Sequence, residues 1–210
     1  MPITDKGLAT RNKIIDTACD LFISQGYHAT STRSIAQAVG MATGAMYNHF
    51  QGKDEIFIEV LNKYHPWREI PFAIRKAKGS NPEEFTKDAA RILSQIWQKK
   101  KNLIKLHLIE LIEFQGTHLP PIFKEVFAES ELELEKNLSK QPMQEHLSRT
   151  AFSQAMLGLF FGLMMTSEFM GVELPNDFSQ LGFQYFSDIY LQGYIKDISK
   201  KGSSNNIEKK

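Results

Sequence analysis

The stretch TGAMYNHFQGKDE, residues 43–55, decides how the whole chain is interpreted. Met46 and Phe50 are four residues apart, so both fall on one face of a short helix. The Tyr-Asn-His run between them is polar and suits a different face. Gly52 then interrupts the pattern, and Lys53 opens another helix. The stretch therefore predicts a short helix that buries one side and presents polar groups on the other.

The residues before this stretch have the pattern of two more helices. Apolar residues recur at three- and four-residue steps over 14–22, and Gly26 is placed to end that helix. Ser31 is a candidate N-cap for a second helix through Val39, which Gly40 ends. Two short helices joined by a glycine-containing turn are typical of a helix-turn-helix unit.

The same spacing divides this predicted unit into an interior and an outer face. The residues expected to pack between its last two helices are Ile35, Ala36, Val39, Met46 and Phe50. The outer face of the last helix carries Thr43, Gly44, Tyr47 and Asn48. In DNA-binding proteins of this kind that helix enters the major groove, with its N-terminal residues nearest the base edges. Taken alone, the polar run is also compatible with an ordinary solvated helix corner.

Residues 8–61 resemble the DNA-binding domain of the tetracycline-repressor (TetR) family. The residues that carry the resemblance, in order and without gaps, are Ala29-Thr30-Ser31, Ile35-Ala36, Gly40, Gly44, Tyr47, His49-Phe50 and Lys53-Asp54-Glu55. The resemblance implies a three-helix DNA-binding head joined by a long fourth helix to an all-α effector and dimerisation domain. It also implies that DNA is approached by Thr32, Arg33, Thr43, Gly44, Tyr47, Asn48, His49 and Lys53.

Two positions depart from the family pattern. Thr43 stands where the family often has a lysine, and Ala45 stands where a polar residue is common. These changes remove a phosphate-binding cation and a hydrogen-bond donor. We therefore add Ala45 to the predicted DNA-binding residues, because apolar contact with thymine methyl groups is open to it and to Thr43.

The predicted head has only a small excess of positive charge. Five cations up to residue 53, namely Lys6, Arg11, Lys13, Arg33 and Lys53, oppose three aspartates, which leaves a net charge of two. Because phosphate attraction grows with the number of cations, each head is expected to bind operator DNA weakly. We therefore expect a homodimer on double-stranded operator DNA. The alternative is a helical protein-interaction module of the same fold that has lost DNA binding.

Beyond the head the strong signals are all helical, so the predicted fold class is all-α. We expect a DNA-binding domain at 1–52, a ligand-binding and dimerisation domain at 53–199, and a disordered tail at 200–210. The helix that opens at Lys53 bridges the two domains. Pro66 and Pro71 are expected to break or kink the pattern that follows. The Phe- and Met-rich segments 147–170 and 178–198 suit a homodimer interface.

The second predicted domain offers a place for a small, largely apolar effector that releases a repressor from its operator. The soft apolar residues of 152–170 suit a pocket, although they equally suit a core or dimer interface. The segment 103–115 is apolar nearly all round and is expected to be buried on several sides. Within it, Glu113 diverges from the face shared by His107 and Glu110, so a polar contact is expected there and a metal is not. The candidate effector contacts are Trp67, Trp97, His107, Glu110, Phe114, Phe127, Phe161, Met164 and Met165.

Composition argues against several other classes of protein. The chain has 210 residues, 42% of them hydrophobic, and a net charge of +1, and none of its apolar segments is long enough to span a bilayer. A single cysteine, Cys19, allows neither an internal disulfide nor a Cys-x-x-Cys site. The chain lacks a glycine-rich phosphate loop and a nucleophile-elbow serine. We expect a cytoplasmic protein that is not an enzyme and needs no cofactor.

Overall fold

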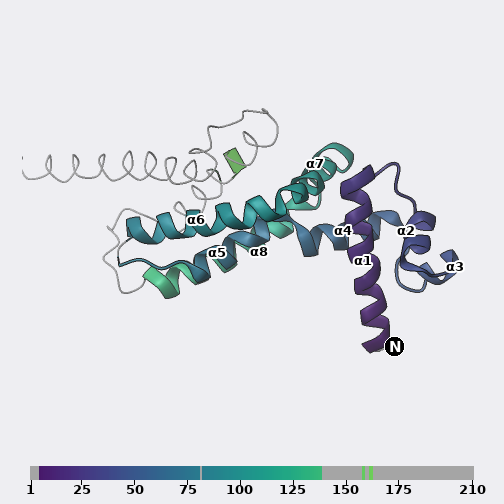
Figure 1. Cartoon of the computed structure of the whole chain (residues 1–210), viewed down its shortest axis with the longest axis horizontal. Helices are drawn as coiled ribbons and strands as arrows, with labels where there is room; N and C mark the ends of the chain where they lie inside the picture. The colour runs from purple at the N-terminus through teal and green to yellow at the C-terminus, as the bar shows by residue number, and fades with distance from the viewer. Residues whose placement is uncertain (1–4, 81, 139–157, 159–160, 163–210) are drawn as a thin grey trace, which may run out of the picture. The chain divides into compact units, whose positions relative to one another are not determined.

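The computed structural model describes residues 5–80, 82–138, 158 and 161–162, and every regular element in those residues is helical. The elements in chain order are α1 (Asp5–Gln25), α2 (Thr32–Val39), α3 (Thr43–Met46), α4 (Lys53–Tyr64), the 3-10 helix η1 (Pro66–Arg68), α5 (Glu69–Lys76), α6 (Pro82–Lys100), the 3-10 helix η2 (Lys101–Leu103), α7 (Ile104–Glu113) and α8 (Leu119–Leu138) (Figure 1). The predicted all-α fold class is confirmed. The predicted dimerisation segments 147–170 and 178–198 and the tail lie outside the described residues, apart from 158 and 161–162.

The helices divide into two compact units. The first contains Met1–Arg68 together with Asn102–Glu125, and the second contains Glu69–Lys101 and the chain from Val126 onward. Thus α7 and the start of α8 share a unit with the predicted head, although they lie far from it in the sequence. The domain boundary between residues 52 and 53 is a division by function, and it stays a prediction.

Capping residues and glycines determine where the helices of the head begin and end. The Ser31 hydroxyl accepts the Ser34 backbone N–H, and the Ser34 hydroxyl accepts the Ser31 backbone N–H, so a reciprocal capping box opens α2. Gly26 and Gly40 follow α1 and α2 with φ of 85° and 81°, a left-handed conformation that favours glycine. The predicted N-cap at Ser31 and the two predicted helix ends are therefore confirmed.

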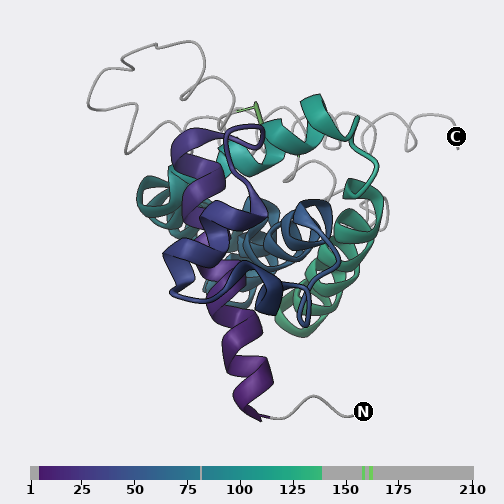
Figure 2. The same ribbon diagram turned by 90° about the vertical axis from the view of Figure 1, so that its right-hand side faces the viewer.

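The core of the first unit forms where α1 packs against α2, α4 and α7 (Figures 1 and 2). Side chains no more than 2% exposed include Ile14, Ala18, Phe22, Ile35, Ala36, Met46, Phe50, Ile56, Phe57, Val60 and Leu61. Burying each of the larger ones stabilises the fold by about 1.5–3 kcal/mol. The buried Cys19 belongs to the same core, and this burial raises the pKa of its thiol to about 12.

An aromatic cluster joins α7 to the head. The ring of Phe114, at the end of α7, stacks on Phe57 of α4 with centroids 5.0 Å apart. Tyr27 meets both rings edge-on at 5.1–5.5 Å. Such aromatic pairs add about 0.5–1.5 kcal/mol beyond the area that they bury. The end of α7 is therefore an integral part of the unit that contains α1–α4.

Three expectations about the helices after α3 need correction. The fourth helix is short, with 12 residues, because Pro66 begins a separate 3-10 turn. Pro71 does not interrupt α5, since it lies in the first turn, where a backbone N–H has no partner inside the helix. The expectation that α7 is buried on several sides is also wrong at its outer face, where Leu111 and Ile112 are 42% and 72% exposed.

The second unit contains α5, α6 and most of α8. Helices α5 and α6 pack together through buried Ile70, Ala73, Ile74, Phe85, Ala89 and Leu93. On α8 the buried Glu133 carboxylate lies 3.1 Å from Arg75 of α5 and 3.1 Å from Lys136. Within the described part of the chain, helices long and apolar enough to cross a bilayer are absent.

Candidate nucleic-acid interface

The short helix α3 and the turn after it separate buried from exposed side chains sharply. Met46 is fully buried and Phe50 is 2% exposed, so these two fix the segment to the core. Tyr47 is 57% exposed, and Gly44 and Asn48 are also exposed. The division follows the helical spacing of the sequence, because residues 44, 47 and 48 fall on one face and residues 46 and 50 on the other.

Gly44 occupies a position where the protein itself has no need of glycine. A Cβ atom built there meets nothing within 4 Å, and its φ lies outside the left-handed region. Neither crowding nor backbone conformation therefore accounts for the missing side chain. What glycine provides here is an open backbone at the exposed face of α3.

The remaining predicted DNA-binding residues surround this face. Thr43 and Ala45 are partly exposed on α3, while Arg33 is exposed and Thr32 partly exposed in the first turn of α2. His49 is partly buried after α3, and its backbone N–H donates to the Met46 carbonyl oxygen at 2.9 Å. All nine predicted residues belong to the first unit.

Three of the five head cations are engaged by the protein. Lys13 Nζ lies 2.9 Å from the Val39 carbonyl oxygen. Lys53 Nζ lies 2.9 Å from the carbonyl oxygen of Tyr27 and 4.0 Å from the centroid of its ring. Since an ammonium group has three N–H donors, these contacts leave Lys53 able to bind a phosphate as well.

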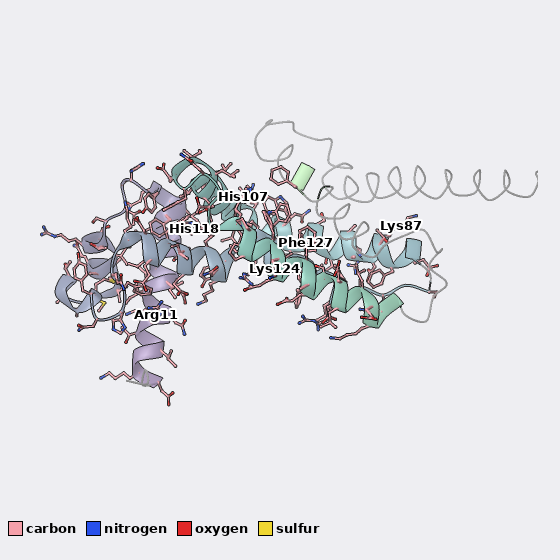
Figure 3. The ribbon with its side chains drawn as sticks, turned by 180° about the vertical axis from the view of Figure 1, so that it is seen from behind. Arg11, Lys87, His107, His118, Lys124 and Phe127 are labelled. Carbon is pink, nitrogen blue, oxygen red and sulfur yellow. The ribbon has the colours of Figure 1, made fainter. Side chains whose placement is uncertain are left out.

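Arg11 is the third engaged cation, and sequence reasoning missed its role. In the sequence Arg11 contributes only a positive charge to the head, yet its guanidinium donates to the carbonyl oxygen of His49, just beyond α3. A signal for this was present, because Arg11 precedes Ile14 and Ile15 by three and four residues and so lies on the buried stripe of α1. Figure 3 labels Arg11 on this helix.

Two of the candidate effector contacts in the first unit, Trp67 and His107, lie at a buried histidine pair formed by His65 and His107. His65 Nε2 and His107 Nδ1 are 3.0 Å apart, and both rings are at most 3% exposed. The Trp67 backbone N–H donates to His65 Nδ1 at 3.4 Å, a contact that favours the tautomer in which His65 Nε2 carries the proton toward His107. The indole of Trp67 stacks on the His107 ring with centroids 6.1 Å apart.

Burial keeps both rings of this pair neutral. Loss of water around the ring lowers the pKa of His107 to about 4. Burial, followed by the nearness of His107 and of the Arg68 cation, holds the pKa of His65 well below its usual value. The surroundings of these rings are neutral, aromatic and nearly free of water, so they suit uncharged groups better than ions.

His107 and Glu110, which share a face in the sequence, have separate partners in the structure. The fully buried Glu110 carboxyl accepts the backbone N–H of His118 at 2.7 Å and lies 3.0 Å from its Nδ1. His107 and His118 are labelled in Figure 3. Glu113 pairs instead with His28 at 2.6 Å. Groups of three or more side chains arranged to bind a metal are absent from the described residues.

The other candidate effector contacts are distributed over both units. Trp67, His107, Glu110 and Phe114 belong to the first unit, whereas Trp97, Phe127 and Phe161 belong to the second. Trp97, Phe127 and Phe161 are all partly exposed. Met164 and Met165 lie outside the described residues.

Comparison with known proteins identifies the helix-turn-helix unit. Residues 14–60 match the family of bacterial regulatory proteins called the tetR family. Residues 14–60 are therefore assigned to the TetR family. Proteins of this family are DNA-binding transcriptional regulators and not enzymes.

Individual relatives agree with the assignment of residues 14–60. The chain is 30% identical over 97 residues to the uncharacterized HTH-type transcriptional regulator YuxN of Bacillus subtilis. The aligned region covers 46% of the chain and 33% of YuxN. It is 38% identical over 60 residues to the HTH-type transcriptional regulator QacR of Staphylococcus aureus, covering 28% of the chain and 32% of QacR. The chain thus spans about a third of the length of these curated relatives.

Similarity to solved structures extends over most of the chain. A TetR family transcription regulator from Marinobacter aquaeolei matches with a TM-score of 0.61 and 16% identity, covering 87% of this chain and 96% of that one. At this identity the match concerns the fold. It supports a helical head and a helical second domain.

Proposed function

We propose that this protein is a transcriptional regulator that binds operator DNA through α3 and the first turn of α2. The observation that carries the proposal is the outward face of α3, where Gly44, Tyr47 and Asn48 are exposed together while Met46 and Phe50 hold the segment in the core. A phenol, an amide and an open stretch of backbone are groups that pair with base edges and phosphates. The glycine at position 44, which the protein itself does not require, suits close approach of the duplex.

The predicted contacts fall into two kinds. Thr43, Ala45 and Asn48 face base edges, where an asparagine amide can bond an adenine at two points and a methyl group can meet thymine. Phosphates are bound by Thr32, Arg33, Tyr47, His49 and Lys53, with the Gly44 backbone beside them. Phosphate contacts set affinity and position, whereas base contacts discriminate between sequences.

Two copies of the chain are needed to bind one operator. The segments 147–170 and 178–198 supply the homodimer interface in this proposal. Each head then occupies one half of a near-palindromic site, with the two α3 helices about 34 Å apart, one turn of DNA. The modest charge of one head makes this pairing important, because two weak contacts combine into a strong one.

The regulator acts as a repressor, and a small, largely apolar effector releases it. The aromatic site around Trp67 and His107 belongs to the same unit as α4, and Phe114 stacks on Phe57 of that helix. An effector that displaces α7 therefore disturbs the packing of α4 and changes the spacing of the heads. Such coupling is reciprocal, so operator DNA must weaken effector binding by the same factor.

Retention of DNA fragments from the gene's own neighbourhood tests this function. We expect the purified chain to retain one fragment in preference to the others, and to lose it as salt rises, since cations neutralise phosphates. Tyr47→Ala and Asn48→Ala should both weaken retention. If the folded wild type binds all fragments negligibly at low salt, DNA binding is wrong and the interaction-module alternative takes its place.

A further inference from the structure

Arg11 connects three parts of the head through one guanidinium group. One of its nitrogens donates to the carbonyl oxygen of His49, the third residue after α3. The other, Nη2, lies 2.9 Å from Glu59 Oε1 and 3.6 Å from Glu55 Oε1, both on α4. The guanidinium also covers the ring of Phe50, with its central carbon 4.0 Å from the ring centroid.

The surroundings of Arg11 are unsuited to a phosphate. Its side chain is 21% exposed, and its planar group already faces a carbonyl oxygen and two carboxylates. One cation beside two carboxylates gives this place a net negative charge, which repels a DNA backbone. Arg11 therefore differs from Arg33, which is exposed on α2.

The same contacts restrain the segment on which α3 depends. Helix α3 has only four residues, and Ala42 at its start makes no side-chain cap. A helix this short has little stability of its own, so its orientation comes from tertiary contacts. Arg11 holds the carbonyl before Phe50, and the Glu55 carboxylate accepts the Gln51 backbone N–H after it at 2.6 Å. With Phe50 buried between these two anchors, the end of α3 is fixed to both α1 and α4.

We propose that Arg11 is a positioning residue, which orients the exposed face of α3 for base contacts without binding DNA itself. This inference rests on the proposed DNA-binding function. It assigns Arg11 to sequence discrimination and removes it from the cations that attract phosphates. A bidentate arginine is needed for this role, because its rigid fork reaches the carbonyl and the carboxylates at once.

The test compares Arg11→Met with a control, Arg33→Met. The control makes the same substitution at an arginine that is exposed on α2. Binding is measured across a salt series, both to an operator duplex selected from random sequence with the wild type and to a duplex of scrambled sequence. For Arg11→Met we expect operator affinity to fall at least tenfold, scrambled-duplex affinity to stay within about twofold, and the salt slope to match the wild type. For Arg33→Met the slope should fall by about one unit per head, with both duplexes weakened similarly.

Two outcomes would overturn the assignment. A lower salt slope for Arg11→Met, with equal losses on both duplexes, would make Arg11 a phosphate contact. Unchanged operator affinity would show that α3 does not depend on it. These results differ from failure of the function itself, in which the wild type binds neither duplex.

Arg11→Lys keeps the test decisive if the methionine variant fails to fold. Lysine preserves the positive charge but lacks the forked guanidinium. If Arg11 binds a phosphate, the lysine variant should therefore still prefer the operator duplex over the scrambled duplex as strongly as the wild type does. Positioning by the fork predicts the opposite, a loss of discrimination with an unchanged salt slope. Circular dichroism confirms that each variant compared is folded.

Discussion

Residues 43–50, which are α3 and the turn after it, contain a mixture of residues similar to that of α7 and use it in the opposite way. Both combine apolar side chains with histidine and other polar groups, and both belong to the first unit. Around α3 the polar residues Tyr47 and Asn48 are exposed. On α7, His107 and Glu110 are buried, each with a polar partner. Buried polar groups need such partners, because leaving them without one costs about 1–3 kcal/mol.

The difference indicates which residues act inside the protein and which act on other molecules. Polar groups on α7 are satisfied within the fold, so changing them is expected to alter stability first. Polar groups on the outer face of α3 support no described core contact, so changing them is expected to alter binding first. The following predictions test this distinction, from the largest expected effect to the smallest.

Acid should destabilise the first unit through its buried histidines. The pKa of His107, about 4, and that of His65 lie below the usual histidine value near 6.5, so the unfolded chain binds more protons than the folded one in this range. The free energy of unfolding should therefore fall as pH drops below 6.5, by up to about 1.4 kcal/mol per pH unit for each histidine. For His107 this loss should level off below about pH 4. Urea unfolding between pH 7.5 and 4.5 measures it.

The variant His107→Leu provides the comparison for the pH experiment. It removes one titrating ring, so its stability should depend less steeply on pH than that of the wild type below pH 6.5. An identical pH dependence in both proteins would show that His107 is not the buried neutral group described above.

Loss of the Glu110 carboxyl should be the most damaging single change on α7. Glu110→Ala leaves a cavity and removes the acceptor for the backbone N–H and ring of His118. We expect a loss of about 2–4 kcal/mol in the free energy of unfolding. The control is Glu113→Ala, whose partner His28 is 79% exposed, and there the loss should be below about 1 kcal/mol. Equal losses in the two variants would contradict the distinction between buried and exposed pairs.

The sequence predicts the ends of helices far better than the partners of buried polar groups. The helix ends at Gly26, Ser31 and Gly40 are predictable because capping and glycine signals act within a few residues. The partner of His107 is His65, 42 positions away, and nothing local in the sequence pairs them. Arg11 contacts a carbonyl 38 positions away. Such contacts depend on how distant helices pack.

The candidate DNA-binding face was predictable for a related reason. Its exposed and buried positions follow from helical spacing over eight residues, together with the ordered family pattern around them. The position of α7 beside the head was not predictable in this way. Phe114 gives no local sign that it stacks on Phe57, since any apolar residue at that position would fit the helix pattern.

Asn48→Ala should separate binding from stability on α3. The Asn48 side chain is exposed, so we expect the free energy of unfolding to change by less than about 0.5 kcal/mol. Operator binding should weaken by about 1–3 kcal/mol if the amide contacts a base. A titration of operator and scrambled duplexes measures the effect, and the scrambled duplex should be nearly unaffected. Equal weakening on both would place Asn48 on a phosphate.

Gly44→Ala should give the smallest change in stability and the most informative one, because its two effects have opposite signs. A Cβ at Gly44 meets nothing within 4 Å, and alanine favours helix more than glycine does. The variant should therefore be as stable as the wild type, or more stable by up to about 1 kcal/mol. On DNA, the added methyl group keeps the backbone of α3 away from the duplex, so operator affinity should fall. Thermal unfolding and operator titration on the same preparation measure both quantities. A variant that is more stable and binds operator as well as the wild type would show that the duplex does not approach α3 at this point, and the docking face would then have to be centred on Tyr47 and Asn48 alone.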